Sequence, residues 1–98
     1  MLEAFELQNL AKKIVRKRMP SVHLDAVLTE NMTSSDGKPA LRITLVLTPE
    51  SVDAISGEEA LKLLVDIRHG LEREGDDRFP IVEYATADDL DGEEDQAA

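Results

Sequence analysis

Two alternating segments joined by a short turn constrain the fold of this chain most. Residues 22–32 and 40–48 place apolar side chains at every second position, a pattern typical of β-strands with one buried face. Between them residues 33–38 read TSSDGK, and Asp36–Gly37 is the predicted tight point of a turn. The sequence therefore predicts an antiparallel hairpin whose apolar face other elements must cover. We expect that face to hold Val22, Leu24, Ala26, Leu28, Leu41, Ile43, Leu45 and Leu47.

Two amphipathic segments can provide this cover. Residues 2–19 carry apolar side chains at helical spacing, and Pro20 ends the predicted helix. A capping-box pattern at Ser56–Glu59 begins a second, longer helix, which we expect to end before Gly75. Thr48-Pro49 is a further helix start and predicts a short turn over residues 49–55. The apolar arc expected of the long helix is Ala60, Leu61, Leu63, Leu64, Val65, Ile67 and Leu71.

The remaining segments complete the expected architecture. Residues 79–86 predict a third strand, so the element order is α-β-β-α-β. Two helices on the apolar face of a three-stranded sheet would bury every apolar stripe, which predicts an α+β two-layer sandwich. Residues 1–86 form the expected single domain, and residues 87–98 are predicted to be a disordered acidic tail.

This element order resembles the type II arrangement of KH-like domains, α-β-β-α-α-β, with one helix missing. That topology occurs in RNA-binding and ribosome-associated proteins, whose GxxG loop between helices clamps the nucleic-acid backbone. No GxxG occurs in this chain. The resemblance is therefore one of element order alone, and it assigns no family.

Charge is distributed very unevenly along the chain. The net charge is −10, yet residues 12–18 hold five of the eleven basic residues. On a helical wheel Phe5 lies among some of these cations, which suggests a partner-binding surface made of Phe5, Lys12, Lys13, Arg16 and Lys17. Three interpretations stay open: a solvated or dimer surface, docking of a protein or of the acidic tail, and nucleic-acid binding.

Several chemical classes find no support in the sequence. The chain has no cysteine, so it forms no disulfide and no thiolate metal site. No signal-peptide pattern and no apolar run of roughly 20 residues occurs, which makes the cytoplasm the expected location. Glycine-rich phosphate loops are also missing. We expect no enzyme, no cofactor, no metal and no membrane association.

Three weaker groupings have plainer explanations. His23, Asp25 and Arg42 are expected together on the polar face of the hairpin, as on any solvated sheet face. Asp66 and His69 could share a metal ion, but two ligands are too few. Residues 89–93 contain some residues of a calcium loop without its full length.

The function expected from these patterns is that of a non-catalytic protein-interaction module. Such a module would be a small acidic cytosolic adaptor, a chaperone or an antitoxin-like partner protein. It would present the outer face of the sheet, or the acidic tail, to a protein or to a second copy of itself, and a homodimer is plausible. The alternative is an RNA-binding or ribosome-associated accessory factor that uses the basic face of the first helix.

Overall fold

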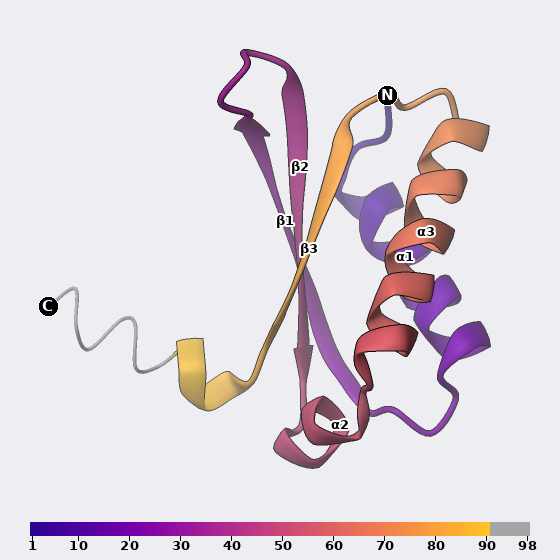
Figure 1. The fold of residues 1–98 in the computed structure, drawn as a ribbon, viewed down its shortest axis with the longest axis vertical. Coiled ribbons are helices and arrows are strands. Elements are labelled where there is room, and N and C mark those ends of the chain that lie inside the picture. Colours follow the sequence, from indigo (N-terminus) through magenta and orange to yellow (C-terminus); the bar gives the residue numbers. More distant parts are fainter. Residues whose placement is uncertain (91–98) are drawn as a thin grey trace, which may run out of the picture.

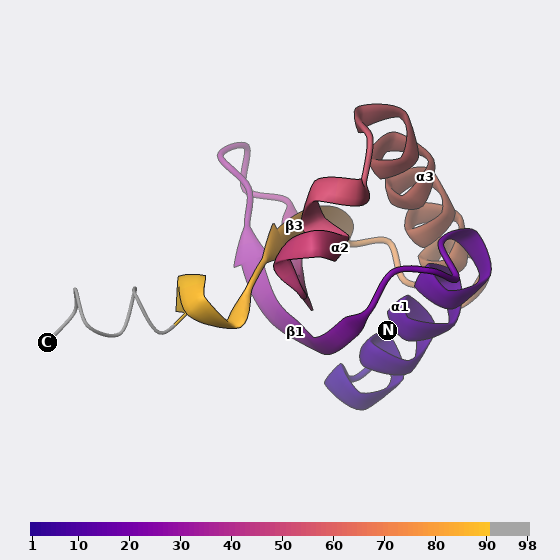
Figure 2. The ribbon, with the colours of Figure 1, turned by 90° about the horizontal axis from the view of Figure 1, so that it is seen from below.

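The computed structural model describes residues 1–90 and confirms the α+β class. Its elements are α1 (Ala4–Arg18), β1 (Leu24–Thr33), β2 (Pro39–Leu47), α2 (Pro49–Ala54), α3 (Gly57–Arg73) and β3 (Phe79–Ala85). The three strands form one sheet, and the two long helices α1 and α3 lie together on one of its faces (Figures 1 and 2). The expected two-layer arrangement is therefore present.

Helix α2 is the short turn that the Thr48-Pro49 pattern predicts. The Thr48 hydroxyl accepts a hydrogen bond from the Ser51 N–H, and Pro49 stands at the first helical position. With α2 the element order becomes α-β-β-α-α-β, so the helix missing from the KH-like comparison is present. The connection from α2 to α3 is only residues 55–56, and it contains no GxxG.

Strand β2 is the centre of the sheet, with β1 antiparallel on one side and β3 parallel on the other. Its residues Leu41, Ile43, Leu45 and Leu47 all point toward the helices and are buried, as the alternation predicts. The hairpin turn is tight at Gly37, which has a φ of 84° and whose N–H donates to the Ser34 carbonyl oxygen. The side-chain alternation and turn chemistry therefore predict the hairpin well.

The facing of β1 differs from the prediction. A register irregularity between Leu24 and Ala26 shifts the alternation by one residue. As a result Val27 enters the core with 4% exposure, while Leu28 turns to the outer face with 44% exposure. A one-residue shift moves every later side chain to the opposite face of the sheet. Leu28, predicted to be a core residue, therefore lies on the solvent side.

The helices are fixed at their ends and along their contact. In α3 the Ser56 and Glu59 side chains form the predicted capping box, and Gly75, with a φ of 75°, ends the helix. Gly70 allows α1 and α3 to approach closely, because a Cβ there would lie 3.2 Å from a Leu10 methyl group of α1.

The predicted apolar arc of α3 is wrong at two positions, because Leu61 and Val65 are exposed.

A buried ion pair joins three distant segments of the chain. Asp76 and Arg78 are both almost fully buried, with hydrogen bonds from Arg78 Nε to Asp76 Oδ1 (3.0 Å) and from Nη2 to Oδ2 (2.5 Å). Arg78 also donates to Asn31 Oδ1 of β1 (2.5 Å) and to the Leu2 carbonyl oxygen (2.8 Å), while the Leu2 N–H donates to Asp76 (3.0 Å). This network ties the start of α1 to the sheet.

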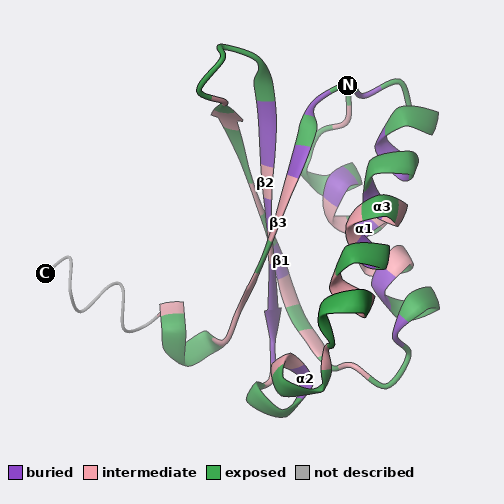
Figure 3. Ribbon diagram, viewed as in Figure 1, coloured by how far each residue is buried: buried purple, intermediate pink, exposed green. Residues whose placement is uncertain are grey.

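Burial follows the two layers (Figure 3). Purple, buried residues run along β2 and along the sides of α1 and α3 that face it, whereas the outward sides of both helices are green. Residues 87–90 form a helical turn after β3, on the side of the sheet away from α1 and α3 (Figures 1 and 2). The rest of the predicted acidic tail, residues 91–98, lies outside the described residues.

Candidate functional site

The outward side of α1 gathers the predicted cations. We call Lys12, Lys13, Arg16 and Lys17 the cationic face of α1; these four residues and Asn9 line one shallow hollow of about 560 Å³. Among residues 1–90, none of the four takes part in an ion pair. Their positive charge is therefore not neutralised within the described part of the chain.

Phe5 does not line that hollow. It lies in the first turn of α1 and is 72% exposed, about 16 Å along the helix axis from Arg16 at 1.5 Å per residue. The structure thus brings the four predicted cations together and leaves the predicted aromatic residue at the other end of the same helix. An apolar ring this exposed is available to a partner.

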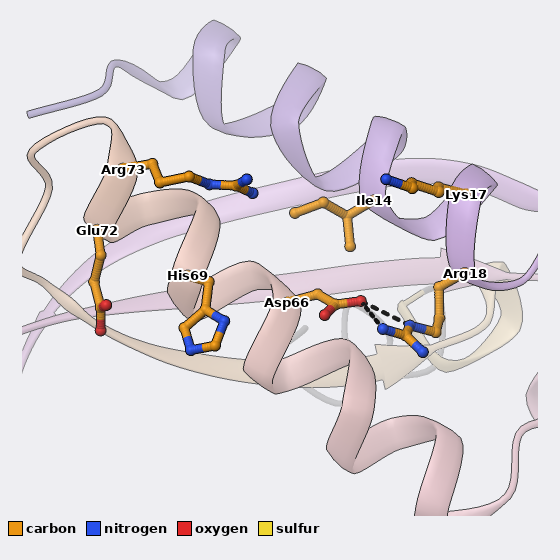
Figure 4. A pocket seen from close by; sticks show the side chains of 7 residues that line it. All are labelled: Ile14, Lys17, Arg18, Asp66, His69, Glu72 and Arg73. Atoms are coloured by element: carbon orange, nitrogen blue, oxygen red, sulfur yellow. Dashed lines mark hydrogen bonds and ion pairs between the residues drawn. The ribbon is translucent and has the colours of Figure 1, made fainter.

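A second hollow of about 850 Å³ lies between α1 and α3 (Figure 4). Arg18 is neutralised there, since its Nη2 atom lies 2.6 Å from Asp66 Oδ2 and its Nε donates to the same oxygen (2.7 Å). Glu72 pairs with Arg68 on the same helix. Lys17 and Arg73 extend over the hollow from the two helices and have no ion-pair partner among the described residues. The lining residues are Ile14, Lys17, Arg18, Asp66, His69, Glu72 and Arg73.

The sheet face away from the helices holds a third hollow, of about 650 Å³, which sequence patterns did not predict. We call it the acidic hollow. Leu28, Thr44 and Glu83 lie side by side on the outer face of the three strands and line it. Its carboxylates are those of Glu30, Glu83, Asp88 and Asp89. The full lining is Leu28, Thr29, Glu30, Arg42, Thr44, Glu83, Tyr84, Ala85, Asp88, Asp89 and Leu90.

Arg42 is the single cation in the acidic hollow, and two carboxylates surround it. Its Nη1 atom lies 3.5 Å from Glu30 Oε2, and its Nε atom lies 3.5 Å from Glu83 Oε1. Arg42 therefore does not join His23 and Asp25, which instead pair with each other at 3.0 Å. With one cation against four acids, the hollow keeps a strongly negative balance that favours a positively charged partner.

A helical turn forms one wall of this hollow. The Thr86 N–H donates to Asp89 Oδ2 (3.0 Å), and the Asp89 N–H donates to the Thr86 hydroxyl (3.2 Å). This reciprocal pattern is a capping box that begins the turn at residues 87–90. The turn brings Asp88 and Leu90 into the lining of the acidic hollow. Part of the segment predicted to be a tail, residues 87–98, therefore lines the site.

Two titratable side chains, Tyr84 and Asp66, bear on the chemistry available to the described residues. The Tyr84 hydroxyl is buried without a hydrogen-bond partner among the described residues, and burial raises the pKa of Tyr84 above its usual value. Asp66, the expected partner of His69, is bound to Arg18 instead. Within residues 1–90 no group of three or more His, Asp or Glu side chains is placed to hold a metal ion.

Comparisons with protein-family models, with curated proteins and with solved structures find no match for this chain. Within the described range, no helix is long and apolar enough to cross a lipid bilayer. What the chain does must therefore be inferred from its own surfaces.

Proposed function

We propose that this protein is a non-catalytic protein-interaction module that binds its partner with the open face of its sheet. The observation that supports this is that α1 and α3 cover only one face, so Leu28 is left 44% exposed in the lining of the acidic hollow. A sheet face that carries apolar side chains gains stability when another element covers it. An adaptor, chaperone or antitoxin-like role in the cytoplasm fits this surface and a chain without cysteine.

The composition of the hollow defines the chemistry of the partner. An exposed leucine among carboxylates matches a protein segment that presents an apolar side chain between Lys or Arg residues. The apolar contact would provide most of the affinity, and the charges would select the partner and orient it.

Affinity capture from a native lysate tests this proposal with two matched leucine variants. Leu28→Asp places a charge on the open sheet face, whereas Leu61→Asp makes the same change on the exposed side of α3. We expect Leu28→Asp to capture at least tenfold less partner protein than the wild type does. Leu61→Asp should capture as much as the wild type. Equal retention by both variants, or loss with Leu61→Asp alone, contradicts the proposed surface.

RNA binding is the second candidate, and the cationic face of α1 favours it. Four cations without ion-pair partners among residues 1–90, together with an exposed Phe5 on the same helix, could contact phosphates and stack on a base. We then expect salt-sensitive binding of a fluorescent oligouridine and its loss in Lys12→Glu/Arg16→Glu. Absence of binding at low salt would exclude this function.

A further inference from the structure

Within residues 1–90, two surfaces of opposite charge lie on opposite sides of the molecule. The cationic face of α1 points away from the core residues Leu7, Ala11 and Val15 of the same helix. The acidic hollow lies on the sheet face that the helices leave open, and both views place the 87–90 turn across the sheet from α1 (Figures 1 and 2). One copy therefore cannot bring its own two surfaces together without unfolding.

The two surfaces complement each other in charge and in polarity. Four cations on α1 would meet a hollow that holds four carboxylates and the one cation Arg42. The acidic hollow also exposes Leu28, and α1 exposes Phe5 in its first turn, toward the end of the helix away from Arg16. The apolar side of α1 is already buried against its own sheet, so the contact would use the cations of the helix and the ring of Phe5.

We infer that α1 of one copy docks on the open sheet face of a second copy. The inference rests on the proposed function, because it names a second copy of this chain as the partner of that face. Because the two surfaces differ and face opposite ways, the contact is heterologous, and copies join head to tail rather than in a two-fold pair. This explains why a chain of net charge −10 keeps a cationic face on one helix.

Sedimentation equilibrium of matched variants tests the inference. The first variant, Lys12→Gln/Lys13→Gln/Arg16→Gln/Lys17→Gln, removes the cations and keeps the hollow. The second, Glu30→Gln/Glu83→Gln/Asp88→Asn, removes three carboxylates of the hollow and keeps Asp89, which caps the 87–90 turn. The control, Glu50→Gln/Asp53→Asn/Glu74→Gln, makes the same change in net charge as the second variant but outside both surfaces. Circular dichroism checks that every variant is folded.

The expected pattern is specific to head-to-tail docking. The average mass of the wild-type protein and of the control should rise with protein concentration, and each surface variant alone should self-associate at least tenfold more weakly. A mixture of the two surface variants should form dimers of one copy of each and no larger species, because only one intact helix face and one intact hollow can meet.

Two results would overturn the inference: a wild-type protein that stays monomeric at all concentrations, or surface variants that stay monomeric when mixed. The proposed function survives such a result if a different protein is captured by the wild type and lost with Leu28→Asp. If the mixture forms dimers while Leu28→Asp captures the same proteins as the wild type, self-association is supported. Binding of a different protein by that face is then contradicted.

Discussion

Two groups of charged residues in this molecule have opposite surroundings. Asp76 and Arg78 are buried, and Arg78 makes hydrogen bonds to Asp76, Asn31 and the Leu2 carbonyl. The cationic face of α1 is largely open to solvent, and its four members have no ion-pair partner among residues 1–90. The same residue types thus hold the fold together in one place and stay available to a partner in the other.

The buried network also shifts the pKa values of its two charged members. Hydrogen bonds from Arg78 hold the pKa of Asp76 well below its usual range, and the same contact raises the pKa of Arg78. Charges in such a network are coupled to folding, whereas exposed charges contribute little to stability. The following changes, in order of expected effect, test this division.

Breaking the buried network should have the largest effect on stability. Asp76→Asn removes the negative charge beside Arg78 and leaves a buried guanidinium without its counter-ion. Removing one partner of a buried pair costs about 3–5 kcal/mol of unfolding free energy. Urea denaturation followed by circular dichroism measures this loss, and a loss below about 1 kcal/mol would show that the network does not hold the fold.

Acid should reproduce part of that loss. Because the folded-state pKa of Asp76 is depressed, its stabilisation is complete above the unfolded-state pKa of about 4 and is lost as pH falls below it. Between pH 5 and pH 3 the wild type should lose about 1 kcal/mol more than Asp76→Asn does. Urea curves at the two pH values measure this difference, and identical pH dependence in both proteins would contradict the assignment.

The ion pair between the helices should give an intermediate effect. Arg18 and Asp66 pair at 2.6 Å, but their side chains are 38% and 32% exposed. A pair this exposed contributes about 0.2–1 kcal/mol, so Arg18→Gln should lower the thermal midpoint slightly. Arg16→Gln removes a neighbouring cation that has no ion-pair partner in the described part of the chain, so it serves as the control and should leave the midpoint unchanged. An equal drop in both would indicate that net charge, and not this pair, sets the effect.

Changes on the cationic face should leave stability nearly unchanged. Lys12→Gln/Lys13→Gln removes two charges without ion-pair partners in the described range, so the unfolding free energy should stay within about 0.5 kcal/mol. Chemical denaturation measures this value. A larger loss would mean that these cations support the fold and are not kept for a partner.

Local sequence patterns predicted the elements well because each signal lies within a few residues. The Ser56 capping box, Pro49 and Gly75 fix helix ends by short-range hydrogen bonds and backbone preference. The irregularity next to Asp25 has no such signal, since strict alternation continues on either side of it. That is why Leu28 was assigned to the wrong face of the sheet.

The sequence predicts the cationic face of α1 but not the acidic hollow. The cations of α1 are neighbours on one helix, so spacing alone brought them together. The acidic hollow joins Glu30, Glu83 and Asp88 from distant parts of the chain, and the Asp76–Arg78 network likewise reaches Leu2 and Asn31. Contacts at such separations depend on strand order, and the sequence pattern did not determine which strand β3 pairs with.

We propose above all that the open face of the sheet is the docking surface. A dilution series of ¹⁵N-labelled protein, followed by two-dimensional NMR, tests it at residue level. We predict concentration-dependent shifts at Leu28, Thr44 and Glu83 together with shifts at Lys12 and Arg16, and none at Leu61. Shifts centred on Leu61 would contradict this docking surface. Spectra that change neither with protein concentration nor on addition of the captured partner would contradict it as well.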